Sequence, residues 1–183
     1  TEKEDRDKPY NGKMSINIPL TRPFAKLRVI TTDMEQLNDL VITPTSAEVE
    51  YTTNLYSSFN AFAGAVNNTK TTKTHDTFVI KTYDDNVDDK SKVLFTDYLF
   101  AADQDEVVNF TLTVYDQYDV IIGKTINFNT PIPARRNYLT TISGNILTDG
   151  NNITVEVKPD FANGTDWDPE GDQFDVEVWD GVT

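Results

Sequence analysis

Strict alternation of apolar and polar residues is the clearest pattern in the chain, and it is typical of strands with one buried face. The apolar positions of the best example are Val108, Phe110, Leu112 and Val114. The turn-forming segment 116–119 follows, and residues 120–128 resume the pattern. We therefore expect a hairpin whose second strand ends at Pro131-Ile132-Pro133, because proline cannot donate a hydrogen bond to a strand ladder.

The rest of the chain shows the same alternation in shorter runs. A long strand is expected over residues 137–148, with a turn at Asp149-Gly150-Asn151 and a return strand that carries Ile153, Val155 and Val157. Further strands are predicted over residues 15–20, 24–31, 47–52, 77–83, 93–100 and 174–179. Many short strands separated by turns predict an all-β sandwich.

Two segments have helical spacing instead. A short helix is expected over residues 34–40, with Asp33 at the N-cap position and Gln36 where a capping box needs it. Leu55, Phe59 and Phe62 are spaced i, i+4 and i+7. These three residues fit either one or two helical turns or a packed aromatic loop.

The length and charge of the chain limit its domain count and its partners. Its 183 residues suit one sandwich domain, which we assign to residues 14–183 with an acidic terminal strand at 174–179. Residues 1–13 are rich in charge and are expected to be a leader or linker. The formal net charge of −14 opposes binding to nucleic acid and to anionic lipid. No apolar run approaches the roughly 20 residues of a membrane span, and no signal peptide is visible.

Candidate catalytic and metal-binding residues are few. The chain has no cysteine, which excludes disulfides, thiolate zinc sites and cysteine nucleophiles. His75 is the single histidine, and no G-x-S-x-G motif accompanies it, so we expect a surface residue and no enzymatic activity. The acidic segment 84–89 offers oxygens for calcium without the spacing of an EF-hand, and we expect a solvated turn. No metal or cofactor site is predicted.

Two segments near the end of the sequence carry candidate binding residues. Trp167 lies between Asp166 and Asp168, and it is either a contact for a sugar or a ring packed on the sandwich edge. The last predicted strand presents apolar residues on one side and acids on the other, and its candidate contact residues are Phe174, Val176, Val178 and Trp179. This strand either pairs in its own sheet or adds to the sheet of another subunit.

Four segments carry a family resemblance. Their sequences are RPFAKLRV at 22–29, YSSFNAFAG at 56–64, TDYLFA at 96–101 and IPARRNYLTTISGNILT at 132–148. In this order they resemble segments of the second domain of fimbrillin-type proteins of Bacteroidota, and the last is the most specific. The resemblance covers roughly residues 21–164. Within the last segment, Gly144 suggests a bulge or a close backbone approach, and Asn137 is expected to tie its side chain to the loop backbone.

The resemblance implies an immunoglobulin-like or transthyretin-like sandwich, export as a lipoprotein precursor and assembly into fimbriae at the outer surface. It also implies that a C-terminal strand completes the domain of a neighbouring subunit. The chain departs from the family in lacking a lipidated cysteine and an N-terminal sandwich before Arg22. We expect that a lipoprotein signal has been removed, and that the chain acts at the cell surface.

Two function classes follow from these observations. The first is a non-enzymatic structural or adhesive subunit of bacterial surface fimbriae, whose partners are other fimbrial subunits joined by strand addition. The second is a surface carbohydrate-binding domain of a glycan-uptake system. Host or bacterial surface glycans or proteins are possible partners in either case. Two or more exposed aromatic rings on one face would favour the glycan-binding class.

Overall fold

The computed structural model describes residues 22–80 and 90–159, which form one helix and twelve strands. The helix is α1 (Met34–Asp39). The longer strands are β1 (Phe24–Thr31), β2 (Ser46–Tyr51), β7 (Thr74–Val79), β8 (Lys92–Phe100), β9 (Glu106–Tyr115), β10 (Ile126–Ala134), β11 (Tyr138–Asn145) and β12 (Asn151–Pro159). The two-residue strands are β3 (Leu55–Tyr56), β4 (Phe59–Asn60), β5 (Ala65–Val66) and β6 (Lys70–Thr71).

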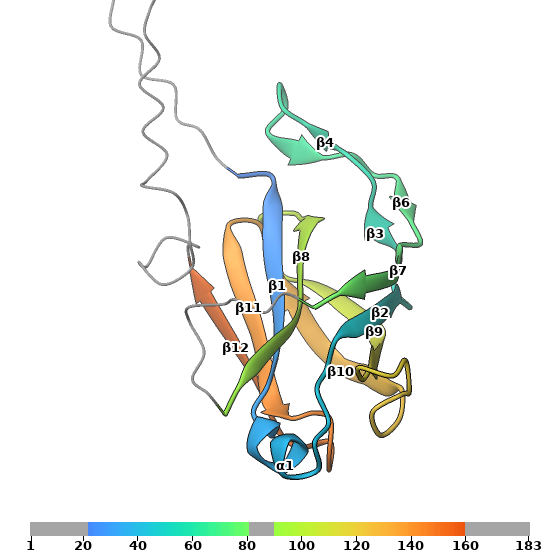
Figure 1. Ribbon diagram of the computed structural model, residues 1–183. Coiled ribbons are helices and arrows are strands. Elements are labelled where there is room, and N and C mark those ends of the chain that lie inside the picture. The colour runs from blue at the N-terminus through green and yellow to red at the C-terminus, as the bar shows by residue number, and fades with distance from the viewer. Residues whose placement is uncertain (1–21, 81–89, 160–183) are drawn as a thin grey trace, which may run out of the picture.

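Two sheets form the body of the molecule (Figure 1). One has the strand order β12-β11-β1-β8-β3-β6, and the other has the order β10-β9-β2-β7. All of the pairings are antiparallel except β1 with β11, where Leu27 lies opposite Thr140. The small hairpin β4–β5 forms a third, separate sheet. This arrangement confirms the predicted all-β sandwich with a short helix.

Alternation along the strands builds the core between the two sheets. On β9 the inward residues Val108, Phe110, Leu112 and Val114 are buried, as their spacing predicts. Phe110 packs on Phe128 of β10, with the ring centroids 4.7 Å apart. Val29 of β1 and Ile142 of β11 lie opposite each other in register, and both side chains are fully buried. Each buried side chain of this size stabilises the fold by about 1.5–3 kcal/mol.

Strand β10 departs from the prediction at its prolines. The strand was expected to end at Pro131-Ile132-Pro133, but it continues to Ala134. Its register against β9 shifts between Phe128 and Ile132, so the ladder is interrupted where proline cannot donate. Because β10 is the outermost strand of its sheet, proline is tolerated there. The strand also begins later than expected, at Ile126.

Helix α1 lies where it was predicted, but the residue at its N-cap position acts differently. Asp33 stands at the N-cap without a side-chain bond to the helix. Its buried carboxylate instead accepts hydrogen bonds from Leu147 N at 2.9 Å, Thr148 N at 2.8 Å and Thr148 Oγ1 at 2.9 Å. Thr31 Oγ1 donates to its other oxygen. The capping-box prediction is therefore wrong, because this side chain joins the helix to the turn between β11 and β12.

Two further details concern the strongest family segment. Gly144 adjoins a register shift between β11 and β12, and a Cβ there would lie 2.8 Å from Asn152 O and 2.9 Å from Ile153 Cα. The predicted close backbone approach is therefore confirmed. Asn137 has a left-handed backbone with a φ of 66°, and its N–H donates to Phe24 O at 2.8 Å. Asparagine tolerates this conformation better than most residues.

Candidate interaction surface

Several predicted site residues lie outside the described part of the chain. They are the acidic segment 84–89, the tryptophan segment with Asp166, Trp167 and Asp168, and the terminal strand with Phe174, Val176, Val178 and Trp179. Their proposed roles stay predictions. Among residues 22–80 and 90–159, no group of three or more histidine or acidic side chains is placed to hold a metal ion. The helix in this part is too short and too polar to span a membrane.

His75 belongs to a polar cluster between the two sheets rather than to an open surface loop. Its Nε2 atom lies 2.8 Å from Asp97 Oδ2, and its ring centroid lies 5.4 Å from that of Phe95. Lys73 Nζ lies 2.7 Å and 2.9 Å from the two oxygens of Asp97. The Tyr51 hydroxyl donates to Asp97 Oδ2 at 2.9 Å. His75 is therefore partly exposed, at 30%, but it is not the isolated loop residue that was expected, because it bonds Asp97 and packs on Phe95.

The Asp97 cluster has the character of a structural tie. Asp97 comes from β8 in one sheet, while Tyr51 and His75 come from β2 and β7 in the other. Both carboxylate oxygens are occupied by donors, as a buried charge requires. Burial, followed by the nearby Asp97 charge, raises the pKa of Tyr51 well above its ordinary value. Tyr51 thus stays protonated and donates to Asp97 across the sandwich.

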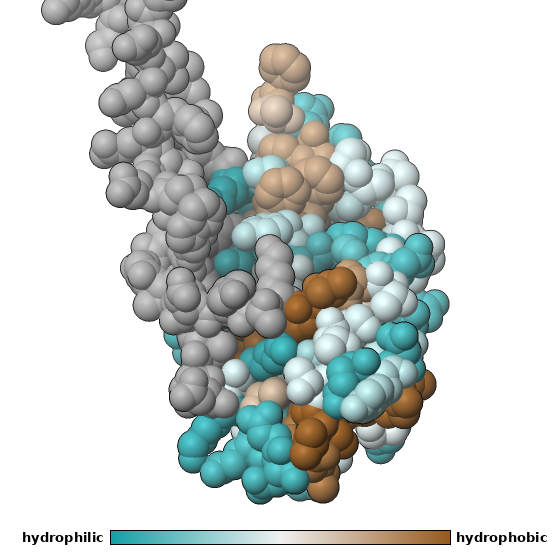
Figure 2. Space-filling view, viewed as in Figure 1, coloured by the Kyte–Doolittle hydropathy of each residue, from teal (hydrophilic) through white to brown (hydrophobic). Residues whose placement is uncertain are grey.

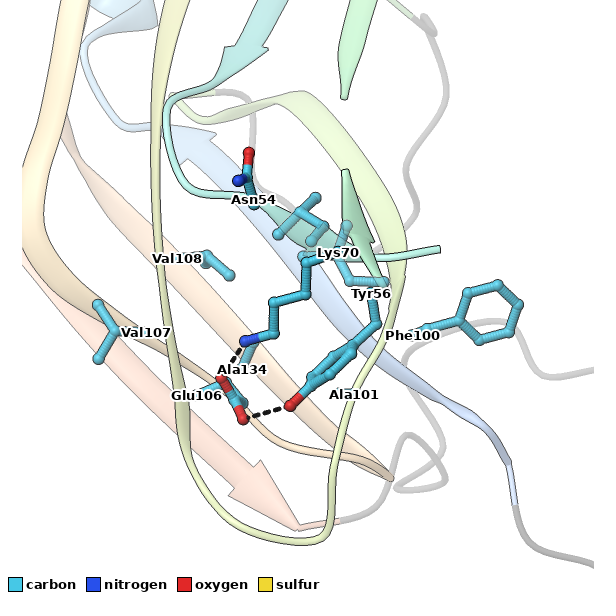
Figure 3. Close-up of a pocket in the computed structure, with 11 residues that line it drawn as sticks. Asn54, Tyr56, Lys70, Phe100, Ala101, Glu106, Val107, Val108 and Ala134 are labelled. Atoms are coloured by element: carbon cyan, nitrogen blue, oxygen red, sulfur yellow. Dashed lines mark hydrogen bonds and ion pairs between the residues drawn. The ribbon is translucent and has the colours of Figure 1, made fainter. Parts of the chain in front are cut away.

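A second polar group lies at a small cavity lined by Leu55, Leu99 and Val108, among other residues (Figure 3). Glu106 accepts hydrogen bonds from the Tyr56 hydroxyl at 2.8 Å and from Lys70 Nζ at 2.9 Å. The hydrogen bond from Lys70 lowers the pKa of Glu106, and the bond to Glu106 raises those of Lys70 and Tyr56. The cavity has a volume of about 20 Å³, which is room for about one water molecule.

The edge strand β12 exposes an apolar row that belongs to the interior face. Val155 lies opposite Ile142 in register, and Val157 lies opposite Thr140. Directly paired residues point to the same side of a sheet, so this row faces the same way as fully buried neighbours. Nevertheless, Ile153, Val155 and Val157 are 40%, 39% and 38% exposed. The opposing sheet therefore leaves the inner face of β12 incompletely covered.

The β4–β5 hairpin is a second exposed apolar feature. It projects beyond the sandwich (Figure 1) and forms an apolar projection at one end of the surface (Figure 2). At its tip Phe62 is 106% exposed. Asn60 Oδ1 accepts hydrogen bonds from the backbone N–H groups of Phe62 and Ala63 at 3.0 Å and 3.1 Å, which fixes the turn. Of the two readings of this segment, the helix is wrong, because the chain forms short strands and a tight turn.

The absence of charged residues is the sequence feature that could have identified this hairpin. Residues 51–69 include no charged side chain, although 25% of the whole chain is charged. Charged residues are the usual cover of a solvated projection, so their absence over 19 residues distinguishes this segment from the rest of the chain. The β12 row, by contrast, looked like an ordinary buried strand face. Its exposure follows from the position of β12 at the edge of its sheet, which alternation alone does not reveal.

Known proteins give one family and one structural likeness. A family model described as a family of unknown function (DUF6562) matches residues 2–177. No curated protein matches the chain. Among solved structures, the chain is similar to a protein of Bacteroides ovatus, provisionally described as a cell adhesion protein, at 14% identity and a TM-score of 0.47. The likeness covers 75% of this chain and 45% of that protein, so the chain spans less than half of its length.

Proposed function

We propose that this chain, which belongs to the family of unknown function DUF6562, is a non-enzymatic structural or adhesive subunit of a bacterial surface fibre. The observation that carries the proposal is the uncovered inner face of β12, an edge strand with an apolar row. The resemblance to fimbrillin-type segments agrees with it. On this proposal the chain acts at the outer surface of the cell after removal of a lipoprotein signal.

Strand addition at β12 is the assembly step that this geometry favours. β12 pairs with β11 along one side, and it is the last strand of its sheet among the described residues. A further strand on the other side gains backbone hydrogen bonds and covers Ile153, Val155 and Val157 with its own apolar side chains. Residues 174–179 have the required alternation, with Phe174, Val176 and Val178 on one side. This segment of one copy is the proposed donor for β12 of another.

A non-enzymatic role is favoured by how the polar side chains are used. The carboxylates of Asp33, Asp97 and Glu106 already accept hydrogen bonds from neighbouring donors. A general base needs a free lone pair directed toward a substrate, and these three have their oxygens turned to the protein. The cavity beside Glu106 is too small for a substrate. We therefore assign these groups to the stability of the sandwich.

Glycan binding is the second candidate, and one observation favours it. Three aromatic rings share the outer face of β1 and β8: Phe24, Tyr98 and Phe100. Phe24 and Phe100 stack with centroids 4.9 Å apart, and Tyr98 is 51% exposed. Such a platform suits a pyranose ring. Titration with plant and host polysaccharides, followed through tyrosine fluorescence and compared with Tyr98→Ala, tests this role, and an identical response of both proteins excludes it.

Truncation tests the fibre subunit most simply. A chain that stops after Gly171 lacks the proposed donor strand and is expected to fold with an unchanged melting temperature. It is also expected to be absent from fibres purified from cells that express it. As a matched pair, Val176→Ser alters the apolar side of the strand and Glu177→Ser alters the opposite side, and only the first is expected to reduce incorporation.

Either of two outcomes contradicts the proposal. If the truncated chain does not fold, residues 174–179 belong to its own core and strand donation is wrong. If it folds and still enters fibres, assembly uses a different surface. On the receiving side, Val155→Asp is expected to block acceptance of a donor strand, while Glu156→Ser on the other face of β12 leaves it unchanged.

A further inference from the structure

The two ends of the sandwich carry complementary features. At one end the β4–β5 hairpin presents Phe62, whose side chain contacts no part of the body to any measurable extent. The hairpin is nevertheless ordered by specific bonds. Asn67 Nδ2 donates to Ser58 Oγ at 2.8 Å, and Arg136 donates to Gly64 O while its guanidinium lies 5.5 Å from the centre of the Phe59 ring. These bonds hold the hairpin while the Phe62 ring stays fully exposed, and aromatic residues are enriched in the buried centre of protein interfaces.

At the other end, the chain leaving α1 forms an apolar corner at Leu40 and Val41. These side chains are 65% and 78% exposed. Val41 has a φ of 60°, a left-handed conformation that is a genuine outlier for a β-branched residue. The conformation is held by Gln117, which donates to Val41 O at 2.9 Å and accepts from Thr43 N at 2.9 Å. Strain of this kind persists only where the surrounding structure imposes it.

These features lie too far apart to meet within one molecule. Figure 1 places the hairpin and α1 at opposite ends of the sandwich, and Figure 2 shows an apolar area at each end of the same view. A contact between them therefore joins two copies. Because the two surfaces differ, the contact is heterologous, and its repetition produces a ring or an open filament rather than a closed dimer.

The charges of the two ends allow this contact between strongly acidic molecules. Each copy has a formal net charge of −14. Asp39 precedes Leu40 in the chain, and Asp116 precedes Gln117, which bonds Val41 O, so carboxylates lie beside the corner. An acidic partner surface of the same molecule would meet repulsion there. Residues 51–69 carry no charge, so the hairpin approaches without an added like-charge pair. Its turn carbonyl and amide groups are in part already bonded within the hairpin, which limits the cost of removing water.

We infer that copies of this chain associate head to tail, with the Phe62 hairpin of one copy seated on the Leu40–Val41 corner of the next. The inference rests on the proposed function, for which it supplies a second contact between subunits besides strand addition. The occupant of the corner is thus a second copy of the same chain. Phe62 is the anchor, and the left-handed backbone at Val41 places an apolar side chain where it can be reached.

Sedimentation of the full 183-residue chain tests this contact at concentrations up to about 1 mM, where weak association is populated. The wild type is expected to form oligomers larger than a dimer. Phe62→Ser and Val41→Asn are each expected to weaken association by about tenfold or more, because each removes an apolar side chain from the contact. Asparagine accepts the left-handed backbone, so Val41→Asn is expected to fold at least as well as the wild type.

A mixture of the two variants separates head-to-tail contact from other arrangements. Phe62→Ser keeps an intact corner and Val41→Asn keeps an intact hairpin, so an equimolar mixture is expected to form a dimer and nothing larger. Val79→Ser, which alters an exposed valine on β7, is the control and is expected to associate like the wild type. Because the chain lacks cysteine, mixed Leu40→Cys and Ala63→Cys variants should also form a disulfide-linked heterodimer on oxidation.

Three results overturn the inference. They are a monomeric wild type throughout the concentration range, unchanged association in both variants, and a mixture that stays monomeric although each variant is folded. None of these results touches the truncation experiment, since removal of the terminal strand leaves both the hairpin and the corner intact. Conversely, normal fibres from the truncated chain would contradict strand donation by residues 174–179. They would leave head-to-tail association to be decided by sedimentation alone.

Discussion

The two ends of this sandwich are secured in different ways. At the helix end, the buried Asp33 carboxylate joins α1 to the turn between β11 and β12 through three hydrogen bonds of 2.8–2.9 Å. At the hairpin end, the main link from the β4–β5 hairpin to the body is Arg136, which bonds Gly64 O and pairs with Asp103 at 2.5 Å. No side chain of β4 or β5 is among the buried core residues.

The two ends therefore differ in what they contribute to the stability of the domain and to contact with other molecules. The helix end shares the cooperative core, so changes there are expected to lower the free energy of unfolding of the whole domain. The hairpin end is ordered without being part of the core, so it is expected to open or change at small cost. A projection of that kind is suited to contact, and it docks on an end that holds its shape.

Removal of Asp33 is expected to have the largest effect. In Asp33→Ala the two backbone donors of Leu147 and Thr148 and the Thr148 hydroxyl lose their acceptor. We expect the free energy of unfolding to fall by about 3 kcal/mol or more, measured by urea denaturation. Asp39→Ala, an exposed carboxylate on the same helix, should change it by less than about 0.5 kcal/mol. Equal effects of the two variants would remove the distinction between the ends.

Weakening the Asp97 tie is expected to rank second. Asp97→Asn removes the charge that Lys73 and His75 face, and it places an amide donor against other donors. A loss of about 2 kcal/mol is expected, which lowers the melting temperature by about 4–8 °C. Asp105→Asn, an exposed neighbour in the loop before β9, is the control. A melting temperature unchanged in Asp97→Asn would show that the cluster does not hold the sheets together.

Substitution of Gly144 probes the β11–β12 pairing. The Cβ of Gly144→Ala would lie 2.8–3.0 Å from the backbone of Asn152 and Ile153, so β12 has to shift. We expect a loss of about 1–3 kcal/mol and faster hydrogen exchange along β12. Gly150→Ala meets open space and carries only the cost of its left-handed φ of 62°, so β12 exchange should be unchanged. Unaltered β12 exchange in Gly144→Ala would contradict the close approach.

The smallest expected effect comes from the Tyr56–Glu106–Lys70 group. Because the pKa of Glu106 is lowered, its contribution is present above the ordinary glutamate pKa of about 4.3 and is lost as the pH falls through the lowered value. The raised pKa of Lys70 gives the opposite sign, with a loss only above about pH 10.4. The pair is partly exposed, so Glu106→Gln should cost less than about 1 kcal/mol at pH 7. Urea unfolding at pH 7 and pH 3 checks that this difference is smaller in acid.

The sequence predicted the layers of the fold better than the surfaces. Alternation at Val108–Val114 identified the central strand, and the bounds of β1 and the start of α1 were found correctly. These elements are determined by local periodicity and burial. The prolines of β10 were misjudged because tolerance depends on β10 being an edge strand, which is a property of the assembled sheet.

Long-range partners explain the remaining errors. Asp33 has the sequence position of a helix cap, yet its carboxylate accepts a hydrogen bond from Leu147 N, which lies 114 residues further along the chain. His75 looked like a surface residue because Asp97 and Tyr51 are brought to it only by the packing of one sheet on the other. The hairpin with Phe62 was ambiguous from spacing alone, although its lack of charge was visible. Local patterns carry no information on which distant group lies opposite a side chain.

Replacement of the hairpin tests most directly whether this segment serves contact between copies rather than folding. Asn67 N donates to Ser58 O at 3.1 Å, so residues 59–66 can be replaced by Asn-Gly, which favours a two-residue turn. We expect a free energy of unfolding within about 1 kcal/mol of the wild type and, in the same preparation, self-association at least about tenfold weaker by sedimentation. An unfolded variant, or a folded one that associates as strongly as the wild type, would contradict the claim.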